Sequence, residues 1–329
     1  MKKKVLVVGL GQCGNKISEI FGKNGYDSIG INTAEEDMLQ LNNIKKIKIG
    51  THGGSGKDRN LAMEQLKDDF GKIFEEVKNS SNGKDVIILC SSLGGGTGSG
   101  TIVATARNIS KLLGKTTIVI GVLPFELEGA NLKNNALQAI GELDKIKNDV
   151  NVMLVKNSND YNNINENLFK RVNAIFKKDG KAETSFDRSD LLNSFRTGYL
   201  EIVIGNSTDI KFESNIYDLN TSQNINFVSM TRKKLEGDNF LRDYKALNKN
   251  FFSYRTSEKD SYFAIFSNIM TPASYINSLK AEIKKTYDDF INIEKEEVCF
   301  DLGIEYDSNK KIKSEVQDTN DTNKFIFDF

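Results

Sequence analysis

The stretch VIILCSSLGGGTGSG, residues 86–100, places a short apolar run directly before five glycines within seven residues. Glycine loses more conformational freedom on folding than any other residue, so such a loop needs a reason, and close approach of the backbone to a ligand supplies one. A nest of backbone N–H groups, with the hydroxyls of Thr97 and Ser99, suits a terminal phosphate group. A merely flexible loop is the alternative, and the strand and helix predicted on either side argue against it.

A second glycine-rich loop follows the apolar run of residues 5–8. Residues 9–14, GLGQCG, match the GxGxxG pattern, in which glycines let backbone N–H groups approach a phosphate at the positive end of a helix. Alone, this pattern fits a tight strand-to-helix turn equally well. Two such loops on parallel strands would clamp a polyphosphate from both sides.

A third stretch, GGSGKD at residues 53–58, resembles a P-loop but departs from it. Asp58 stands where Ser or Thr should ligate magnesium, and Thr51 replaces the first glycine. We interpret the stretch as a loop that lies over the phosphates, within reach of His52 or Lys57. For His52, a solvated loop position is the alternative.

Six short apolar runs alternate with segments of helical periodicity through the first half of the chain. The runs cover residues 4–8, 28–31, 44–49, 86–90, 117–123 and 150–155, and the clearest helical segments cover 102–113 and 131–147. Several runs are apolar on both faces, as strands of a helix-covered parallel sheet must be. They therefore predict an α/β fold with a doubly wound parallel sheet.

The pattern changes in the second half of the chain. Helical spacing over 161–178 is followed by strands near 199–204, 226–230 and 262–266, and by a long helix from Pro272 with Thr271 as its N-cap. We expect a parallel-sheet domain over 1–160, a central connecting helix over 161–183, a smaller α+β domain over 184–300, and a polar, acidic tail over 301–329.

Composition argues against several classes of protein. The chain has 329 residues with 45 basic and 45 acidic side chains, and this zero formal charge gives no reason to expect direct DNA binding. Three cysteines without metal-ligand spacing and a single histidine argue against a metal site built on those residues. No apolar run approaches the roughly 20 residues of a membrane span, so we expect a soluble, cytoplasmic protein that does not contact membranes.

The two glycine-rich loops carry a family resemblance. GQCGN at residues 11–15 resembles the nucleotide loop of tubulin, and GGGTGSG at 94–100 resembles the tubulin/FtsZ signature. Further landmarks of the family follow in order, with Asn32-Thr33, then Pro124-Phe125 with Glu128-Gly129, then Asn157. On these residues the chain is identified as a member of the tubulin/FtsZ superfamily, most similar to its TubZ branch of plasmid and phage partition proteins.

The resemblance implies GTP and GDP as ligands, with Mg²⁺ on the phosphate oxygens, although it names no magnesium ligand. It assigns nucleotide contacts to Gly11, Gln12, Cys13, Asn15, Asn32, Gly94, Gly95, Gly96, Thr97, Gly98, Ser99, Glu128, Asn157, Phe169 and Asn173. In this family an aromatic residue on the connecting helix stacks on guanine, and an Asn or Asp four residues later hydrogen-bonds its edge. Phe169 and Asn173 have that spacing, which places them on one helical face. Considered alone, Phe169 fits a core position as well.

The catalytic assignment also follows from the resemblance. Asp187 and Asp190, in the stretch DRSD, resemble the acidic loop that enters the nucleotide site of the next subunit and completes it. In isolation such a pair is more often a helix-start cap. Ser185 replaces the Asn that the family carries just before this pair. Leu132 replaces the basic residue that usually follows the Glu-Gly of the family's ribose loop, and Lys133 is adjacent.

The function implied is that of a filament-forming GTPase whose hydrolysis is activated by head-to-tail assembly. Such a filament would act in plasmid or phage DNA partition in a bacterial host, with a TubR-like helix-turn-helix adaptor on a centromere-like site supplying the DNA contact. One alternative is a phage-centring or cell-division-type homologue that acts as a scaffold. Another is an NAD-binding oxidoreductase, based on GxGxxG with Glu35 and Glu36 downstream, but it leaves the 94–100 loop unexplained.

Overall fold

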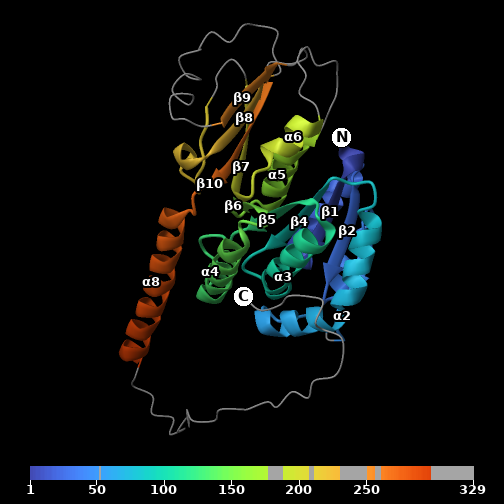
Figure 1. Cartoon of the computed structure of the whole chain (residues 1–329). Coiled ribbons are helices and arrows are strands. Elements are labelled where there is room, and N and C mark those ends of the chain that lie inside the picture. Colours follow the sequence, from blue (N-terminus) through green and yellow to red (C-terminus); the bar gives the residue numbers. More distant parts are fainter. Residues whose placement is uncertain (52, 177–187, 207–210, 230–249, 256–260, 298–329) are drawn as a thin grey trace.

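The computed structural model describes residues 1–51, 53–176, 188–206, 211–229, 250–255 and 261–297 (Figure 1). In that part of the chain, ten strands form one sheet in the order β3-β2-β1-β4-β5-β6-β7-β10-β8-β9. The first half contains η1 Lys2–Lys4, β1 Val5–Leu10, α1 Gly11–Lys23, β2 Asp27–Asn32, η2 Glu36–Met38, β3 Lys45–Lys48, α2 Arg59–Ser80, β4 Val86–Ser92, α3 Gly96–Leu113, β5 Thr116–Val122, α4 Ala130–Ile146 and β6 Asn151–Val155. Strands β1 to β6 are parallel, so the doubly wound α/β prediction is confirmed.

The second half extends the same sheet. It contains α5 Tyr161–Phe176, α6 Arg188–Ser194, β7 Gly198–Asn206, η3 Leu219–Thr221, β8 Asn224–Ser229, β9 Asn250–Arg255, β10 Ser261–Ile269 and α8 Ala273–Glu297. Strand β7 joins β6 in parallel, and β10 runs antiparallel to both β7 and β8. The mixed strands expected here are therefore present, but they continue the first sheet instead of forming one of their own.

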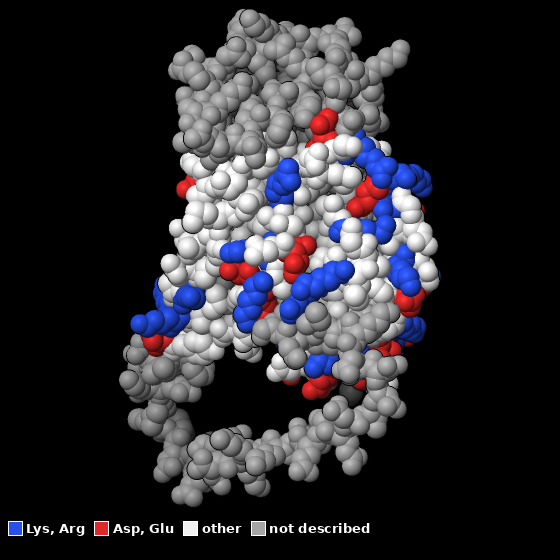
Figure 2. Space-filling model, in the orientation of Figure 1, with Lys and Arg blue, Asp and Glu red and all other residues white. Residues whose placement is uncertain are grey.

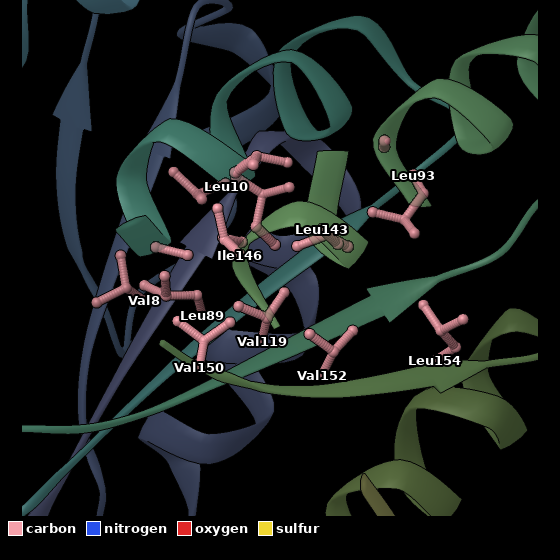
Figure 3. Close-up of a cluster of buried hydrophobic side chains, with 14 of the residues drawn as sticks. Val8, Leu10, Leu89, Leu93, Val119, Leu143, Ile146, Val150, Val152 and Leu154 are labelled. Carbon is pink, nitrogen blue, oxygen red and sulfur yellow. The ribbon is translucent and has the colours of Figure 1, made fainter. Parts of the chain in front are cut away.

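Strand residues are buried on both faces of the parallel part because helices cover both sides. In β1, Leu6 and Val8 face a cluster shared with α2, α3 and α4, whereas Val5 and Val7 face one shared with α1 and α5. Figure 3 shows the first cluster, with side chains of β1, β4, β5 and β6 meeting those of α4. This two-sided packing fixes the carboxyl ends of the strands, where the glycine-rich loops lie.

Helix α8 packs along α4 (Figure 1). Leu279 and Ile283 bury their side chains in the first cluster. The Thr271 hydroxyl, expected to cap this helix, donates to Asp144 Oδ1 at 2.7 Å and accepts from Lys147 Nζ at 2.9 Å. Thr271 thus ties the start of α8 to the end of α4.

The sequence analysis missed several elements of the described part, among them β9, the short helix α6 and the long helix α2. Asp58, which we noted only as a departure from the P-loop, is the N-cap of α2. Its Oδ1 accepts from the backbone N–H groups of Asn60 and Leu61 at 2.8 and 3.2 Å. Part of the segment 184–300, and all of the tail 301–329, lie outside the described residues.

The surface of the described part mixes charges of both signs. On the face drawn in Figure 2, basic and acidic side chains lie near one another in several places, among residues of other kinds. None of the helices that the structure describes has the length and apolarity needed to cross a membrane.

Candidate functional site

The two long glycine-rich loops meet at the carboxyl edge of the parallel sheet. Gly11 begins α1 with φ +71°, and a Cβ there would lie 3.0 Å from the backbone N of Gly98. The N-cap residues of α1 and α3, Leu10 and Gly95, supply no side-chain cap to the first N–H groups. Two positive helix ends with uncapped donors therefore converge, and this arrangement binds anions.

A cavity of about 930 Å³ opens above these helix ends. Its volume lies within the range typical of ligand pockets in proteins. Its walls come from the loops that follow β1, β2, β3, β4, β5 and β6, and from the first turn or two of α1, α3, α4 and α5. The loops that carry Asn32, Glu128 and Asn157 therefore line the same cavity as the two glycine-rich loops.

The third glycine-rich stretch lies against the 94–100 loop, and its position over the phosphates stays a prediction. Ser55 Oγ is 3.1 Å from Thr97 Oγ1, which in turn is 2.8 Å from Thr33 Oγ1. A Cβ on Gly96 would lie 2.8 Å from the backbone N of Asp58 and closer still to Ser55 Oγ, so only glycine fits there without a shift. Three hydroxyls thus gather at the start of α3. His52 lies outside the described residues.

Asp37 organises one wall of the cavity, and the sequence analysis did not single it out. Its Oδ1 accepts from Gln12 Nε2 at 2.8 Å, and its Oδ2 accepts from Asn32 Nδ2 at 3.0 Å. All three residues line the cavity. Asp37 therefore orients the two amide side chains that the family resemblance had assigned to the nucleotide.

Glu128 shapes the loop after β5. Its Oε2 accepts from the backbone N–H of Phe125 at 2.6 Å, which closes a short turn, and Glu128 itself lines the cavity. Leu132, one helical turn further, also lines the cavity, whereas Lys133 is buried against α8. The cation that the family carries near the ribose is therefore missing from this wall.

Cys13 lines the cavity but is not a nucleophile at neutral pH. Burial raises the pKa of its thiol to about 12, and the charge of Glu128 adds to this rise, while Lys16 opposes it. Because a thiolate is the reactive form, the protonated thiol serves here as a small apolar wall.

Most residues predicted for the nucleotide line the cavity. They are Gly11, Gln12, Cys13, Asn32, Gly95, Gly96, Thr97, Gly98, Glu128 and Asn157. Asn15, Gly94 and Ser99 lie behind this layer. Asn15 is buried and accepts from the Ile31 N–H at 3.1 Å, and the Ser99 hydroxyl donates to the carbonyl of Gly95. Their contacts support the loops instead of facing the cavity.

Phe169 and Asn173 are not brought to the cavity. Phe169 is only 8% exposed, and its ring packs edge-on against Phe21 and Tyr26, with centroid distances of 5.1 and 6.5 Å. Asn173 Oδ1 accepts from the Tyr26 hydroxyl at 3.0 Å. The core interpretation of Phe169 therefore holds, and the pair stabilises the contact between α5 and α1.

Tyr161 and Asn165 line the cavity instead. They have the same aromatic-to-Asn spacing of four residues, in the first turns of α5, and Tyr161 is 53% exposed. The sequence analysis did not single out this second pair, which lies in YNNIN at residues 161–165.

Asp190 lies at the opposite end of the sheet from the cavity. It belongs to α6, whose Arg188 pairs with Asp85, just before the amino end of β4, while Ser92 at the carboxyl end of β4 lines the cavity. Asp190 therefore cannot act on the cavity of its own chain. Asp187 and Ser185 lie outside the described residues.

Comparison with known proteins agrees with this geometry. Residues 4–165 match the profile of the Tubulin/FtsZ family, GTPase domain. This chain contains a tubulin/FtsZ GTPase domain. The domain spans β1 to the start of α5 and so includes all of the loops that line the cavity.

Relatives of this chain include the tubulin-like protein CetZ of Pyrococcus abyssi, which is 31% identical over 207 residues. That match covers 57% of this chain and 57% of the relative, so the chain spans little more than half the length of the curated relative.

Solved structures match over a larger part of the chain. TubZ of Clostridium botulinum phage c-st, with its C-terminal tail truncated, gives a TM-score of 0.73 at 18% identity, covering 88% of this chain and 99% of that one. A GTPγS-form protofilament of TubZ from Bacillus thuringiensis serovar israelensis gives a TM-score of 0.72 at 19% sequence identity, covering 90% of this chain and 95% of that one. The fold is thus that of tubulin/FtsZ proteins, including the second half beyond residue 165.

Proposed function

We propose that the chain binds GTP and GDP in the 930 Å³ cavity, and that it hydrolyses GTP to GDP and phosphate when its copies assemble into a filament. The observation that carries this proposal is the convergence of the uncapped starts of α1 and α3 on one cavity of the tubulin/FtsZ fold. Donors fixed in this way offset phosphate charge without reorganising, which is how an electrostatic catalyst lowers a barrier.

The cavity walls divide into parts that fit the parts of a nucleotide. The N–H groups of Gly95–Gly98 and the hydroxyls of Thr33, Ser55 and Thr97 face the phosphates. Glu128 lies where the family contacts the ribose. We assign guanine to Asn157, with Tyr161 stacking on the base and Asn165 accepting or donating at its edge, in place of Phe169 and Asn173.

Magnesium fits this site as a partner of the phosphates. Mg²⁺ is usually held by one or two carboxylates and by substrate phosphate oxygens, and the described residues contain no cluster of three or more metal-binding His, Cys, Asp or Glu. Asp37, already placed in the wall by Gln12 and Asn32, is the carboxylate we assign to this role. The ion would neutralise phosphate charge.

Asp190 completes the site of the next copy. Because it lies at the amino end of the sheet and the cavity at the carboxyl end, a head-to-tail contact brings Asp190 of one copy to the cavity of its neighbour. There its carboxylate orients the water that attacks the terminal phosphate, with Asp187 as a second acid. A contact between different surfaces of identical chains builds an open filament.

The test is phosphate release from GTP and from ATP, followed with light scattering over a range of protein concentrations. We expect GTP-selective release that rises cooperatively and together with scattering. Asp190→Ala should bind GTP and assemble but hydrolyse slowly, whereas Asp68→Ala, on the exposed face of α2, should behave like the unaltered chain. Constant activity per chain down to nanomolar protein would refute hydrolysis at the subunit contact.

We infer further that the filament acts in plasmid or phage DNA partition in a bacterial cytoplasm. Likeness in shape to TubZ of a Clostridium botulinum phage supports this role. The DNA contact would come from a TubR-like helix-turn-helix adaptor, since the chain's formal charge is zero. Deleting the gene should cause loss of its replicon over unselected generations. If the chain were a scaffold instead, deleting its gene would leave inheritance of the replicon unchanged and would displace the cargo of the scaffold.

A further inference from the structure

Helix α6 is short, and its two ends are held by different contacts. It has seven residues, Arg188–Ser194. Toward its end, Leu191 and Ser194 are fully buried, and the Ser194 hydroxyl donates to the Asp190 carbonyl at 2.9 Å. At its start, Nη2 of Arg188 donates to Asp85 Oδ1. Packing therefore fixes the second half of the helix, and the ion pair of Arg188 holds its start.

Asp85 is itself fixed by the sheet. It comes directly before β4, at the amino end of the parallel strands. Its backbone N–H donates to the Lys4 carbonyl at 2.8 Å, and its carbonyl accepts from the Thr116 N–H at 3.2 Å, which ties it to the starts of β1 and β5. Its side chain is only 12% exposed, and Oδ2 is buried without a hydrogen-bond partner among the described residues. Since a charge shielded from water needs a partner, Asp85 is a firm anchor for Arg188.

The two contacts of α6 together set its rotation about its own axis. Helical residues three apart are neighbours on one face, whereas residues two apart do not face each other. Arg188 and Leu191 are three apart, and Leu191 packs into the core cluster on the α1 and α5 side of the sheet. Asp190 follows Arg188 by two residues and is half-buried. Holding Arg188 and Leu191 in place therefore also fixes the direction of the Asp190 side chain.

We propose that Asp85, through Arg188, is a positioning residue for Asp190. The ion pair sets the direction in which α6 presents the Asp190 carboxylate to the cavity of the next copy. This inference rests on the proposed function, because it concerns the part that Asp190 plays at that site. Asp85 lies at the amino end of β4, whereas Ser92 at the carboxyl end lines the cavity of the same chain. Nucleotide binding in that cavity should therefore not depend on Asp85.

The test measures kcat and KM for GTP, with kcat expressed per sedimented chain, in Asp85→Asn and Arg188→Gln. Misplacing a catalytic group by about 1 Å costs up to about 100-fold in rate, so we expect each variant to lower kcat roughly 10-fold. Neither KM nor Kd for GTPγS should change, because the cavity is intact. Arg188→Lys, which keeps the positive charge, should retain more of kcat than Arg188→Gln. Urea unfolding should show little change, since Arg188 is largely exposed.

The double variant Asp85→Asn with Arg188→Gln tests whether the two residues act as a pair. Residues that act through one contact give non-additive effects when both are replaced. The double variant should therefore have about the same kcat as either single variant. A kcat reduced by the product of the two single effects would mean that Asp85 does not act through Arg188, and would overturn the inference.

Asp149→Asn is the matched control. Asp149 lies two residues before β6, at the same end of the sheet, and its Oδ2 is 3.6 Å from Lys111 Nζ of α3. Removing this ion pair should leave kcat unchanged, because it does not involve α6. Unchanged kcat in Asp85→Asn would overturn the inference, as would a weakening of GTPγS binding equal to the loss of kcat. If the unaltered chain released no phosphate from GTP at any concentration, the proposed function itself would fail, which is a distinct result.

Discussion

Replacing Phe169 and Tyr161 in turn tests whether Tyr161, and not the buried Phe169, stacks on the base as we propose. Phe169 is 8% exposed and makes edge-on contacts with two rings. Burying a phenylalanine side chain contributes about 1.5–3 kcal/mol, and each aromatic pair adds about 0.5–1.5 kcal/mol. Phe169→Ala should therefore lower the free energy of unfolding by about 3–5 kcal/mol, as in other Phe→Ala core substitutions.

Tyr161→Ala should leave the free energy of unfolding nearly unchanged and weaken nucleotide binding. Tyr161 is 53% exposed, so its loss should change the free energy of unfolding by less than about 0.5 kcal/mol. Stacking of a base on an aromatic ring is worth about 1–3 kcal/mol by alanine substitution, so Kd for GTPγS should rise roughly 5- to 150-fold. Tyr287→Ala, which removes a similarly exposed tyrosine from α8, is the control and should leave Kd unchanged.

The assays are urea unfolding followed by circular dichroism, and GTPγS binding by calorimetry, on the same preparations. For Phe169→Ala, binding should be measured well below the unfolding transition, so that only folded protein is compared. The reasoning would be refuted if Phe169→Ala weakened GTPγS binding at near-normal stability, or if Tyr161→Ala bound GTPγS as tightly as the unaltered chain.

Three shorter predictions concern the cavity and the first helix. Gly96→Ala should weaken GTPγS binding at least about 10-fold, because its Cβ would displace Ser55 from the start of α3; calorimetry measures this, and unchanged binding would contradict it. Burial acts to raise the pKa of Glu19, but hydrogen bonds from Asn43 outweigh it and hold that pKa below its usual value. The contribution of Glu19 to the free energy of unfolding is thus complete above about pH 4.3 and is lost as the pH falls through the lowered pKa. Urea unfolding from pH 6 to pH 2 should therefore show a decrease in the free energy of unfolding that is absent from the Glu19→Gln variant. Because burial raises the pKa of the Cys13 thiol to about 12, iodoacetamide should label it at pH 7.5 far more slowly than it labels free cysteine. Mass spectrometry measures the labelling, and a rate equal to that of free cysteine would contradict the raised pKa.

The parallel half of the fold was predictable because its strands are buried on both faces. Every residue of β1 and almost all of β4 to β6 is buried, so these strands read as continuous apolar runs between helical segments. Helix α2 also carried a signal, with Phe70, Ile73 and Val77 at spacings of three and four. The sequence analysis considered only the P-loop-like stretch before this helix, residues 53–58, and did not predict the helix itself.

The residues of α5 that line the cavity were harder to predict because α5 contains the same spacing twice. Tyr161 with Asn165, and Phe169 with Asn173, lie eight residues apart, or about two helical turns. Which pair meets the cavity depends on where the helix begins relative to β6, and this is a property of tertiary packing. The contact of Asp37 with Gln12 and Asn32 likewise could not be predicted from the sequence, because only folding brings these three side chains together.

Strand β3 forms one edge of the ten-stranded sheet, and its sequence is KKIK. Its three lysines are exposed, and only Ile47 is buried. An open edge is a template for pairing with a strand of another molecule, and charged side chains along it, lysine above all, oppose such pairing. In the filament that we propose, where copies are at high local concentration, this would protect against lateral fusion into cross-β aggregates. Growth is then left to the ends of the molecule.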